Sequence, residues 1–144
     1  PAFDLVLKAP QRALLALMSS LAPDLPLGNG LDPEWVSTDP TVVAAYRKDP
    51  LIHDRVTARL VRFMIDSGEL VRERAAVWSV PTLLMWAEDD RCVSPSGSDE
   101  FAADAPASFV TAQAFPGFAH EIFNEPGRDR PLATMTRWLG EQYR

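Results

Sequence analysis

The feature that most constrains this chain is an apolar run of strand length, VPTLLMWA (80–87), followed at once by three acids (88–90). Pro81 stands where a strand can begin. Apolar runs without alternation are typical of strands that are covered on both faces, as in parallel sheets. A second short strand is predicted at SFVTAQAF (108–115). The sequence therefore predicts an α/β fold with a parallel sheet.

Charge and cysteine content narrow the class of protein. The 144 residues suit one ordinary domain, and their formal net charge is −6 without a cluster of Lys or Arg. We therefore expect no nucleic-acid partner. Cys92 is the single cysteine, which excludes an internal disulfide and a cysteine-rich zinc site. The single cysteine is also compatible with a cytoplasmic location.

Residues 1–76 are expected to contain only helices and loops. A helix is predicted over 8–21, another short one after Asp39 as N-cap and Pro40 at the first helical position, and a longer one capped by Asp54. No apolar stretch here, or anywhere in the chain, approaches the roughly 18 residues of a membrane-spanning helix.

The predicted helix over 8–21 has a polar stripe that contains Gln11, Arg12 and Ser19. At 100° per residue, Leu14, Leu17 and Leu21 lie opposite this stripe and are expected to face inward, whereas Leu15 lies within it. One interpretation is a surface helix on which Leu15 is the exposed leucine. The alternative is a lid helix that contacts lipid.

Residues 77–144 follow a different pattern: strand, helix (96–104), strand, and a closing amphipathic helix within 125–143. Two parallel strands leave unpaired backbone groups at the edge of the sheet. We therefore expect the sheet to be completed from outside this sequence. The first residues, PAFDLVLKAP, have no initiator Met and no signal-peptide pattern, which suggests that the sequence begins within a longer protein.

The acids and one histidine fall at equivalent places after the two predicted strands. Glu88, Asp89 and Asp90 follow the first strand, and His120 follows the second. The carboxyl ends of parallel strands meet at one edge of the sheet, about 5 Å apart for neighbouring strands. An acid and a histidine placed there can form the orienting half of a Ser-His-Asp triad.

The sequence resembles the carboxyl-terminal half of the monoacylglycerol lipase group of α/β-hydrolases, also described as lysophospholipase-like or serine-aminopeptidase-like. The resemblance covers essentially the whole chain. It lies in the segments LAPDLPLGNGLDPEWVSTDPTVVAAYRKDPLIHDR (21–55), VPTLLMWAEDDRCVSPSGS (80–98) and FPGFAHEIFNEPGR (115–128). The implied fold is a partial α/β-hydrolase fold: a helical lid over 1–76, then the last two parallel strands and their helices over 77–144.

The family's acid loop selects one of the three acids. The family pattern begins with a small residue and has Asp three positions later, Val three positions after the Asp, and Pro two positions after the Val. Ala87, Asp90, Val93 and Pro95 match this pattern. The resemblance therefore implies that Asp90 is the triad acid and His120 its partner. Glu88 and Asp89 are interpreted as residues of a solvated turn.

The nucleophile expected for such an enzyme is not in this sequence. No serine here stands in a G-x-S-x-G frame, and no oxyanion loop of the HG type is present. The resemblance implies that both precede the lid, so the expected partners are a missing amino-terminal half and an acyl-ester substrate. No cofactor and no metal are expected. Cys92 is read as a small buried thiol, and His53 as a structural residue of a lid turn.

The resemblance further implies that the lid covers an acyl pocket, with Leu14, Leu17 and Met18 as candidate substrate-binding residues. A transient contact of the lid with a membrane surface is a related hypothesis. Other reactions of the same fold stay open, namely those of a peptidase, a thioesterase or a haloperoxidase. A non-catalytic binding module is the alternative from another class.

Overall fold

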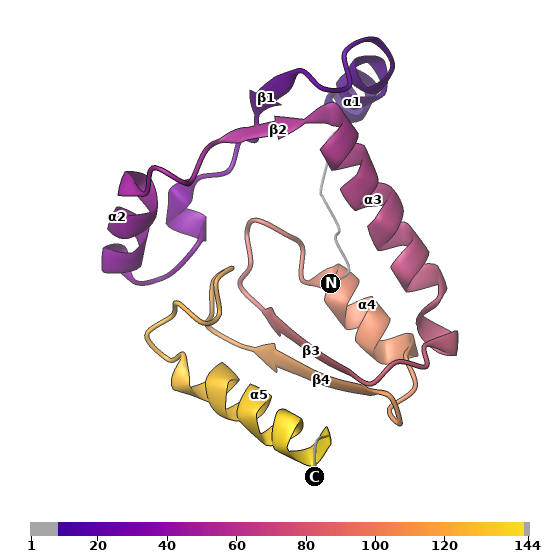
Figure 1. The fold of residues 1–144 in the computed structure, drawn as a ribbon, viewed down its shortest axis with the longest axis vertical. Helices are drawn as coiled ribbons and strands as arrows, with labels where there is room; N and C mark the ends of the chain where they lie inside the picture. Colours follow the sequence, from indigo (N-terminus) through magenta and orange to yellow (C-terminus); the bar gives the residue numbers. More distant parts are fainter. Residues whose placement is uncertain (1–8, 143–144) are drawn as a thin grey trace.

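The computed structural model describes residues 9–142, and its ribbon is shown in Figure 1. The elements in chain order are α1 (Ala9–Leu21), β1 (Pro26–Gly28), η1 (Pro33–Trp35), α2 (Pro40–Lys48), β2 (Arg55–Thr57), α3 (Ala58–Glu73), η2 (Ala75–Val77), β3 (Thr82–Ala87), α4 (Ser96–Asp104), β4 (Val110–Phe115) and α5 (Asp129–Gln142). Lys8 and Tyr143, the outer ends of two predicted helices, lie outside the described residues.

The two predicted strands form a parallel pair, as the apolar run indicated. β3 pairs with β4 in a register that runs from Thr82 opposite Val110 to Ala87 opposite Phe115. Helices cover both faces of the pair: α3 and α4 lie on one side and α5 on the other (Figure 1). The run is therefore apolar at successive positions because both faces of the strand are covered.

Alternate residues of β3 enter two separate cores. Leu84 packs with Ala75, Phe101 and Val110 on the side of α3 and α4, and Trp86 lies against this cluster. On the opposite face, Ala87 packs with Phe115, Phe118 and Ile122, and Met85 lies against them. This period of two is what a pleated strand imposes on its side chains. The second core holds the loop after β4, which is the loop that carries His120.

The prediction that residues 1–76 contain only helices and loops is wrong. β1 and β2 form a short antiparallel pair in which Leu27 lies opposite Val56. The pair joins segments far apart in the sequence and leaves η1 and α2 on the connection between them (Figure 1). Each strand is only three residues long, so neither shows a period-two pattern that a sequence can reveal.

One predicted helix cap is confirmed and another is wrong. Asp39 caps α2, since its Oδ1 accepts a hydrogen bond of 2.8 Å from the backbone N–H of Thr41. Asp54 does not cap α3, because the residues after it are extended in β2. Thr57 takes that role, and its Oγ1 accepts a hydrogen bond of 3.2 Å from the backbone N–H of Leu60.

The expected orientation of α1 is also wrong. Leu14, Leu17 and Leu21 are exposed, whereas Leu15 and Met18 are half-buried where α1 packs on α3. The central turns of α1 are apolar nearly all round, so helical periodicity alone does not decide which stripe is covered. No helix among residues 9–142 is long and apolar enough to cross a membrane.

Gly127 lies against Phe118, a residue of the second core. A Cβ added at Gly127 would lie 2.9 Å from Cζ of Phe118, whose ring contacts the ring of Phe115 and the guanidinium of Arg130. We expect Gly127→Ala to lower the free energy of unfolding by about 1–3 kcal/mol, the usual range for overpacking. Thermal unfolding measures the change. The control is Gly140→Ala, because a Cβ there meets nothing within 4 Å; equal stability of the two variants would contradict the prediction.

Candidate active site

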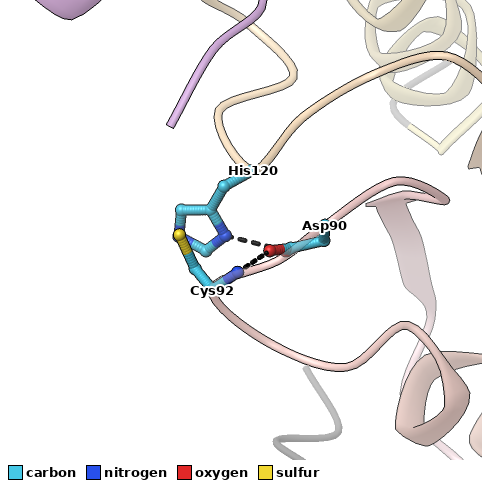
Figure 2. A group of neighbouring side chains, drawn as sticks. All are labelled: Asp90, Cys92 and His120. Atoms are coloured by element: carbon cyan, nitrogen blue, oxygen red, sulfur yellow. Dashed lines mark hydrogen bonds and ion pairs between the residues drawn. The ribbon is translucent and has the colours of Figure 1, made fainter. Parts of the chain in front are cut away.

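The structure brings Asp90 and His120 into direct contact beyond the carboxyl ends of β3 and β4. Nδ1 of His120 lies 2.8 Å from Oδ2 of Asp90 (Figure 2). Asp90 stands in the turn after β3, and His120 in the loop after β4. Parallel pairing of the two strands places both turns at the same edge of the sheet. The contact between the two side chains that the sequence predicted is therefore present.

The second carboxylate oxygen of Asp90 is held by the backbone of its own turn. Oδ1 accepts hydrogen bonds from the N–H groups of Cys92 (2.8 Å) and Val93 (3.0 Å). The Asp90 side chain is only 12% exposed, and this burial opposes its ionisation. The hydrogen bonds from His120, Val93 and Cys92 outweigh burial and hold the pKa of Asp90 below its ordinary value. The group is thus a fixed anion.

His120 is anchored through its backbone while its ring stays accessible. Its N–H points to the carbonyl of Trp35 at 3.4 Å, and the N–H of Glu121 donates to the carbonyl of Val36 at 2.8 Å. The side chain is 40% exposed. With Nδ1–H donating to Asp90, the proton-accepting nitrogen of the neutral ring is Nε2. The pair can therefore accept a proton at Nε2 and stabilise the resulting imidazolium.

The hydrogen bond to Asp90 raises the pKa of His120 above its ordinary value, although burial acts in the opposite direction. We expect an NMR titration of the ring to show this raised pKa, and Asp90→Asn to lower it. A pKa of the Asn variant equal to or above that of the unmodified protein would contradict the assignment. Because the folded-state pKa is raised, the stability that this contact contributes is complete below the unfolded-state pKa and is lost as pH rises through the folded-state value.

Glu88 and Asp89, the other two acids of the run, connect the acid loop to β4 and to the histidine loop through different groups. The N–H of Glu88 donates to the carbonyl of Phe115 at 3.2 Å and so extends the pairing of the strands. Oδ2 of Asp89 accepts a hydrogen bond of 3.0 Å from the N–H of Gly117, whose φ is +79°. The interpretation of Asp89 as a residue of a merely solvated turn is thus incomplete, because its carboxylate joins the acid loop to the histidine loop.

Cys92 and His53 occupy different places. Cys92 is half-buried beside Asp90 and His120 (Figure 2). Burial, assisted by the charges of Asp90 and Glu121, raises the pKa of the Cys92 thiol to about 11.

His53 lies before β2, and its Nδ1 accepts a hydrogen bond of 3.2 Å from the N–H of Arg55. This contact fits the structural role that the sequence suggested for His53.

A set of contacts between residues 35–38 and 120–125, here called the loop clamp, was missed by sequence reasoning. Glu125 is only 3% exposed, and its Oε1 accepts a hydrogen bond of 2.7 Å from the N–H of Thr38. Its Oε2 accepts from the hydroxyl of Thr38. The hydroxyl of Ser37 donates to the carbonyl of Asn124 at 3.1 Å. With the two backbone bonds at His120 and Glu121, these contacts fix the histidine loop to the segment after η1.

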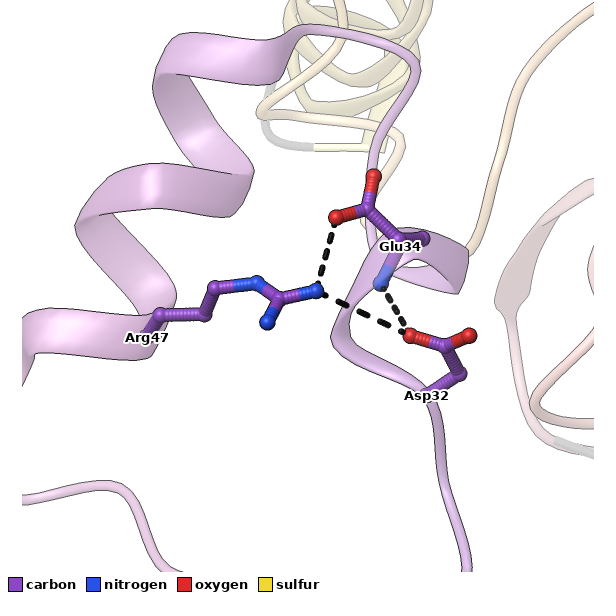
Figure 3. Close-up of polar contacts among 3 residues, drawn as sticks. All are labelled: Asp32, Glu34 and Arg47. Carbon is purple, nitrogen blue, oxygen red and sulfur yellow. Dashed lines mark hydrogen bonds and ion pairs between the residues drawn. The ribbon is translucent and has the colours of Figure 1, made fainter.

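Further polar contacts hold η1 itself. Nη2 of Arg47, on α2, lies 2.7 Å from Oε1 of Glu34 and 4.0 Å from Oδ1 of Asp32 (Figure 3). Asp32 also caps η1, since its Oδ1 accepts from the N–H of Glu34 at 3.1 Å. The guanidinium of Arg91 lies 5.2 Å from the ring centre of Trp35. The acid loop and α2 therefore both contact the element that carries the carbonyl facing His120.

The candidate substrate-binding residues do not share a cavity with Asp90 and His120. Those two side chains line a cavity of about 150 Å³. Leu14 and Met18 line a separate cavity of about 180 Å³ formed by α1, the β1–β2 pair and α3. Leu17 lines neither cavity. The structure thus places two of the three predicted lid residues, Leu14 and Met18, in one cavity.

A carboxylate after one parallel strand is hydrogen-bonded to a histidine after the next, an arrangement compatible with the acid and histidine of an α/β-hydrolase fold. The family profile described as "Serine aminopeptidase, S33" matches residues 1–127, and the chain belongs to this family. Its fold is part of the α/β-hydrolase fold, consisting of helices, the parallel β3–β4 pair and the short β1–β2 pair.

Relatives and solved structures agree with this assignment. The chain is 35% identical over 128 residues to a monoacylglycerol lipase of Mycolicibacterium smegmatis, covering 88% of this chain and 45% of the relative. It is 27% identical to a phospholipase of Bacillus subtilis, covering 88% and 49%. The crystal structure of the Paleococcus ferrophilus monoacylglycerol lipase matches with a TM-score of 0.88 and 30% identity, covering 96% of this chain and 55% of that one. The chain thus spans about half the length of these relatives.

Proposed function

We propose that this chain supplies the triad acid and histidine of a serine ester hydrolase that cleaves monoacylglycerols or similar acyl esters. The observation that carries the proposal is the 2.8 Å contact between Asp90 Oδ2 and His120 Nδ1. Membership of the S33 family and the similarity to two monoacylglycerol lipases support it. The serine and the oxyanion donors would come from outside these 144 residues.

In this proposal Asp90 orients the ring of His120, and Nε2 takes the proton of the serine hydroxyl while the serine oxygen bonds to the ester carbonyl carbon. The proton then passes to the leaving alcohol as its C–O bond breaks. Water then attacks the acyl carbonyl carbon while Nε2 of His120 takes the water proton. The fatty acid leaves as its bond to the serine oxygen breaks, and the proton returns to that oxygen. Asp90 stays ionised throughout and stabilises the imidazolium.

The partner in this proposal is an amino-terminal half that completes the sheet. Among the described residues β3 pairs only with β4, so the second edge of β3 offers backbone groups to another strand. We call the assembly of both halves the complete hydrolase. Residues 77–144 would form the carboxyl-terminal part of its core, and residues 1–76 would form its lid.

The apolar side chains of the lid are suited to contact the acyl chain of a substrate. Leu14 and Met18 line a largely apolar cavity, and Leu17 and Leu21 are exposed on the same helix, α1. We propose that these side chains cover the acyl chain of the substrate, and that the exposed leucines allow a transient contact with a membrane surface in a cytoplasmic enzyme. Co-sedimentation of the complete hydrolase with phospholipid vesicles tests the second part; loss of co-sedimentation in Leu17→Ser would support it.

A substrate panel tests the reaction. The complete hydrolase is assayed on monoacylglycerols of several chain lengths and on matched p-nitrophenyl esters, anilides and thioesters. We expect turnover of monoacylglycerols and esters. The family's description as aminopeptidases makes cleavage of the anilides the second candidate, and a preference for anilides would replace esterase by peptidase. Absence of turnover on the whole panel would favour a binding module and contradict the proposal.

A further inference from the structure

Three different metal-ligating groups converge beside the contact between Asp90 and His120. A carboxylate oxygen of Asp90, Sγ of Cys92 and a ring nitrogen of His120 all lie within 4.8 Å of one another (Figure 2). The convergence follows from the fold of the acid turn. Because Asp90 Oδ1 accepts the N–H of Cys92 at 2.8 Å, the chain turns back and places the thiol next to the ring.

The spacing of the three groups is close to that of a metal site. Zinc binds oxygen and nitrogen at about 2.0–2.2 Å and sulfur at about 2.3 Å, so tetrahedral ligand atoms lie roughly 3.3–3.7 Å apart. Ligand atoms within 4.8 Å therefore need to close by about 1.5 Å at most. Rotation of the Cys92 side chain and a small movement of the accessible ring can supply this.

The donor set selects a class of cation. Thiolate and imidazole ligands favour Zn²⁺ and similar soft divalent ions over Mg²⁺ or Ca²⁺, which prefer oxygen. The surroundings are negative, since the carboxylates of Asp90 and Glu121 act on both the thiol and the ring. A cation bound there would gain from this negative potential, and coordination would release the thiol proton to solvent.

We propose that Asp90, Cys92 and His120 form an inhibitory site for a soft divalent cation such as Zn²⁺, which rests on the hydrolase function proposed above. Coordination through Nδ1 of His120 would replace its hydrogen bond to Asp90. Coordination through Nε2 would occupy the nitrogen that takes the serine proton. In either case the imidazole no longer transfers protons, so hydrolysis stops while the metal is bound.

Cadmium provides a readout that needs no activity, because a cadmium thiolate has an ultraviolet charge-transfer absorption. We expect Cd²⁺ added to the complete hydrolase to produce this band and Cys92→Ser to remove it. In parallel, Zn²⁺ is titrated against ester hydrolysis, with each variant compared with its own metal-free rate. Loss of one ligand should raise the inhibitory Zn²⁺ concentration at least about 10- to 100-fold, the range seen even for lost outer-shell partners. His53→Gln, in the other histidine, is the control and should shift neither readout.

The outcomes separate this inference from the proposed function. An equal Cd²⁺ band and equal Zn²⁺ inhibition in the unmodified protein and Cys92→Ser would overturn the metal site, whatever the enzyme hydrolyses. A Cd²⁺ band that depends on Cys92 in a protein without hydrolase activity would support the cation site and contradict the proposed function. Zn²⁺ inhibition relieved by Cys92→Ser supports both.

Discussion

Asp90→Asn is expected to lower the kcat of the complete hydrolase by about 10⁴-fold, as loss of the triad carboxylate does in serine hydrolases. The physical reason is the tautomer of His120. An Asn oxygen can still accept the N–H groups of Cys92 and Val93, which leaves the side-chain amide to face Nδ1. An amide N–H in that place donates to Nδ1 and moves the ring proton to Nε2, so Nε2 no longer accepts the serine proton.

His120→Ala is expected to have an effect at least as large, because it removes the base itself. Initial rates of ester hydrolysis under substrate saturation measure both losses, and active-site titration corrects for inactive protein. The matched control is Asp89→Asn, in the adjacent acid. Its side-chain oxygen can still accept the N–H of Gly117, so its rate should stay within about ten-fold of the unmodified enzyme. Near-normal turnover of Asp90→Asn and His120→Ala would end the assignment of the pair.

The parts of the fold that the sequence predicts are those with strong local signals. β3 is an apolar run of strand length, and α2 begins at an Asp-Pro pair, so both could be placed from residues close together in the chain. The contact of Asp90 with His120 follows from the same signals, because parallel pairing brings the ends of β3 and β4 to one edge. Selection of Asp90 among the three acids required the resemblance to a family.

The parts that could not be predicted depend on contacts between distant residues. β1 and β2 are too short to show a pattern, and α1 is apolar on nearly every side, so its buried stripe is set by α3. The loop clamp is a similar case. Glu125 and Thr38 are 87 positions apart, and a glutamate in a Pro- and Gly-containing loop is usually exposed. Only the folded structure shows that this carboxylate is buried and paired.

Glu125→Ala is expected to lower both stability and activity, because the buried carboxylate is the acceptor for two donors of Thr38. Removal leaves the Thr38 N–H without this acceptor in a part-buried site and opens space beside it. We expect the free energy of unfolding to fall by about 2–4 kcal/mol. Since the clamp also fixes the loop that carries His120, kcat should fall by about 10- to 100-fold, the effect of a displacement of roughly 1 Å in a catalytic group.

Two further variants separate positioning from general loss of stability. Thr38→Val removes only the hydroxyl donor and keeps the backbone N–H, so its losses should be smaller than those of Glu125→Ala. Val110→Ala destabilises the first core, which lies on the face of β3 opposite the histidine loop. If the clamp positions His120, Glu125→Ala should lose more kcat than Val110→Ala when both are assayed well below their unfolding temperatures, with little change in KM. Equal kcat in the two variants would reduce Glu125 to a purely structural residue, because a folded enzyme with an undisturbed histidine loop has no reason to react more slowly.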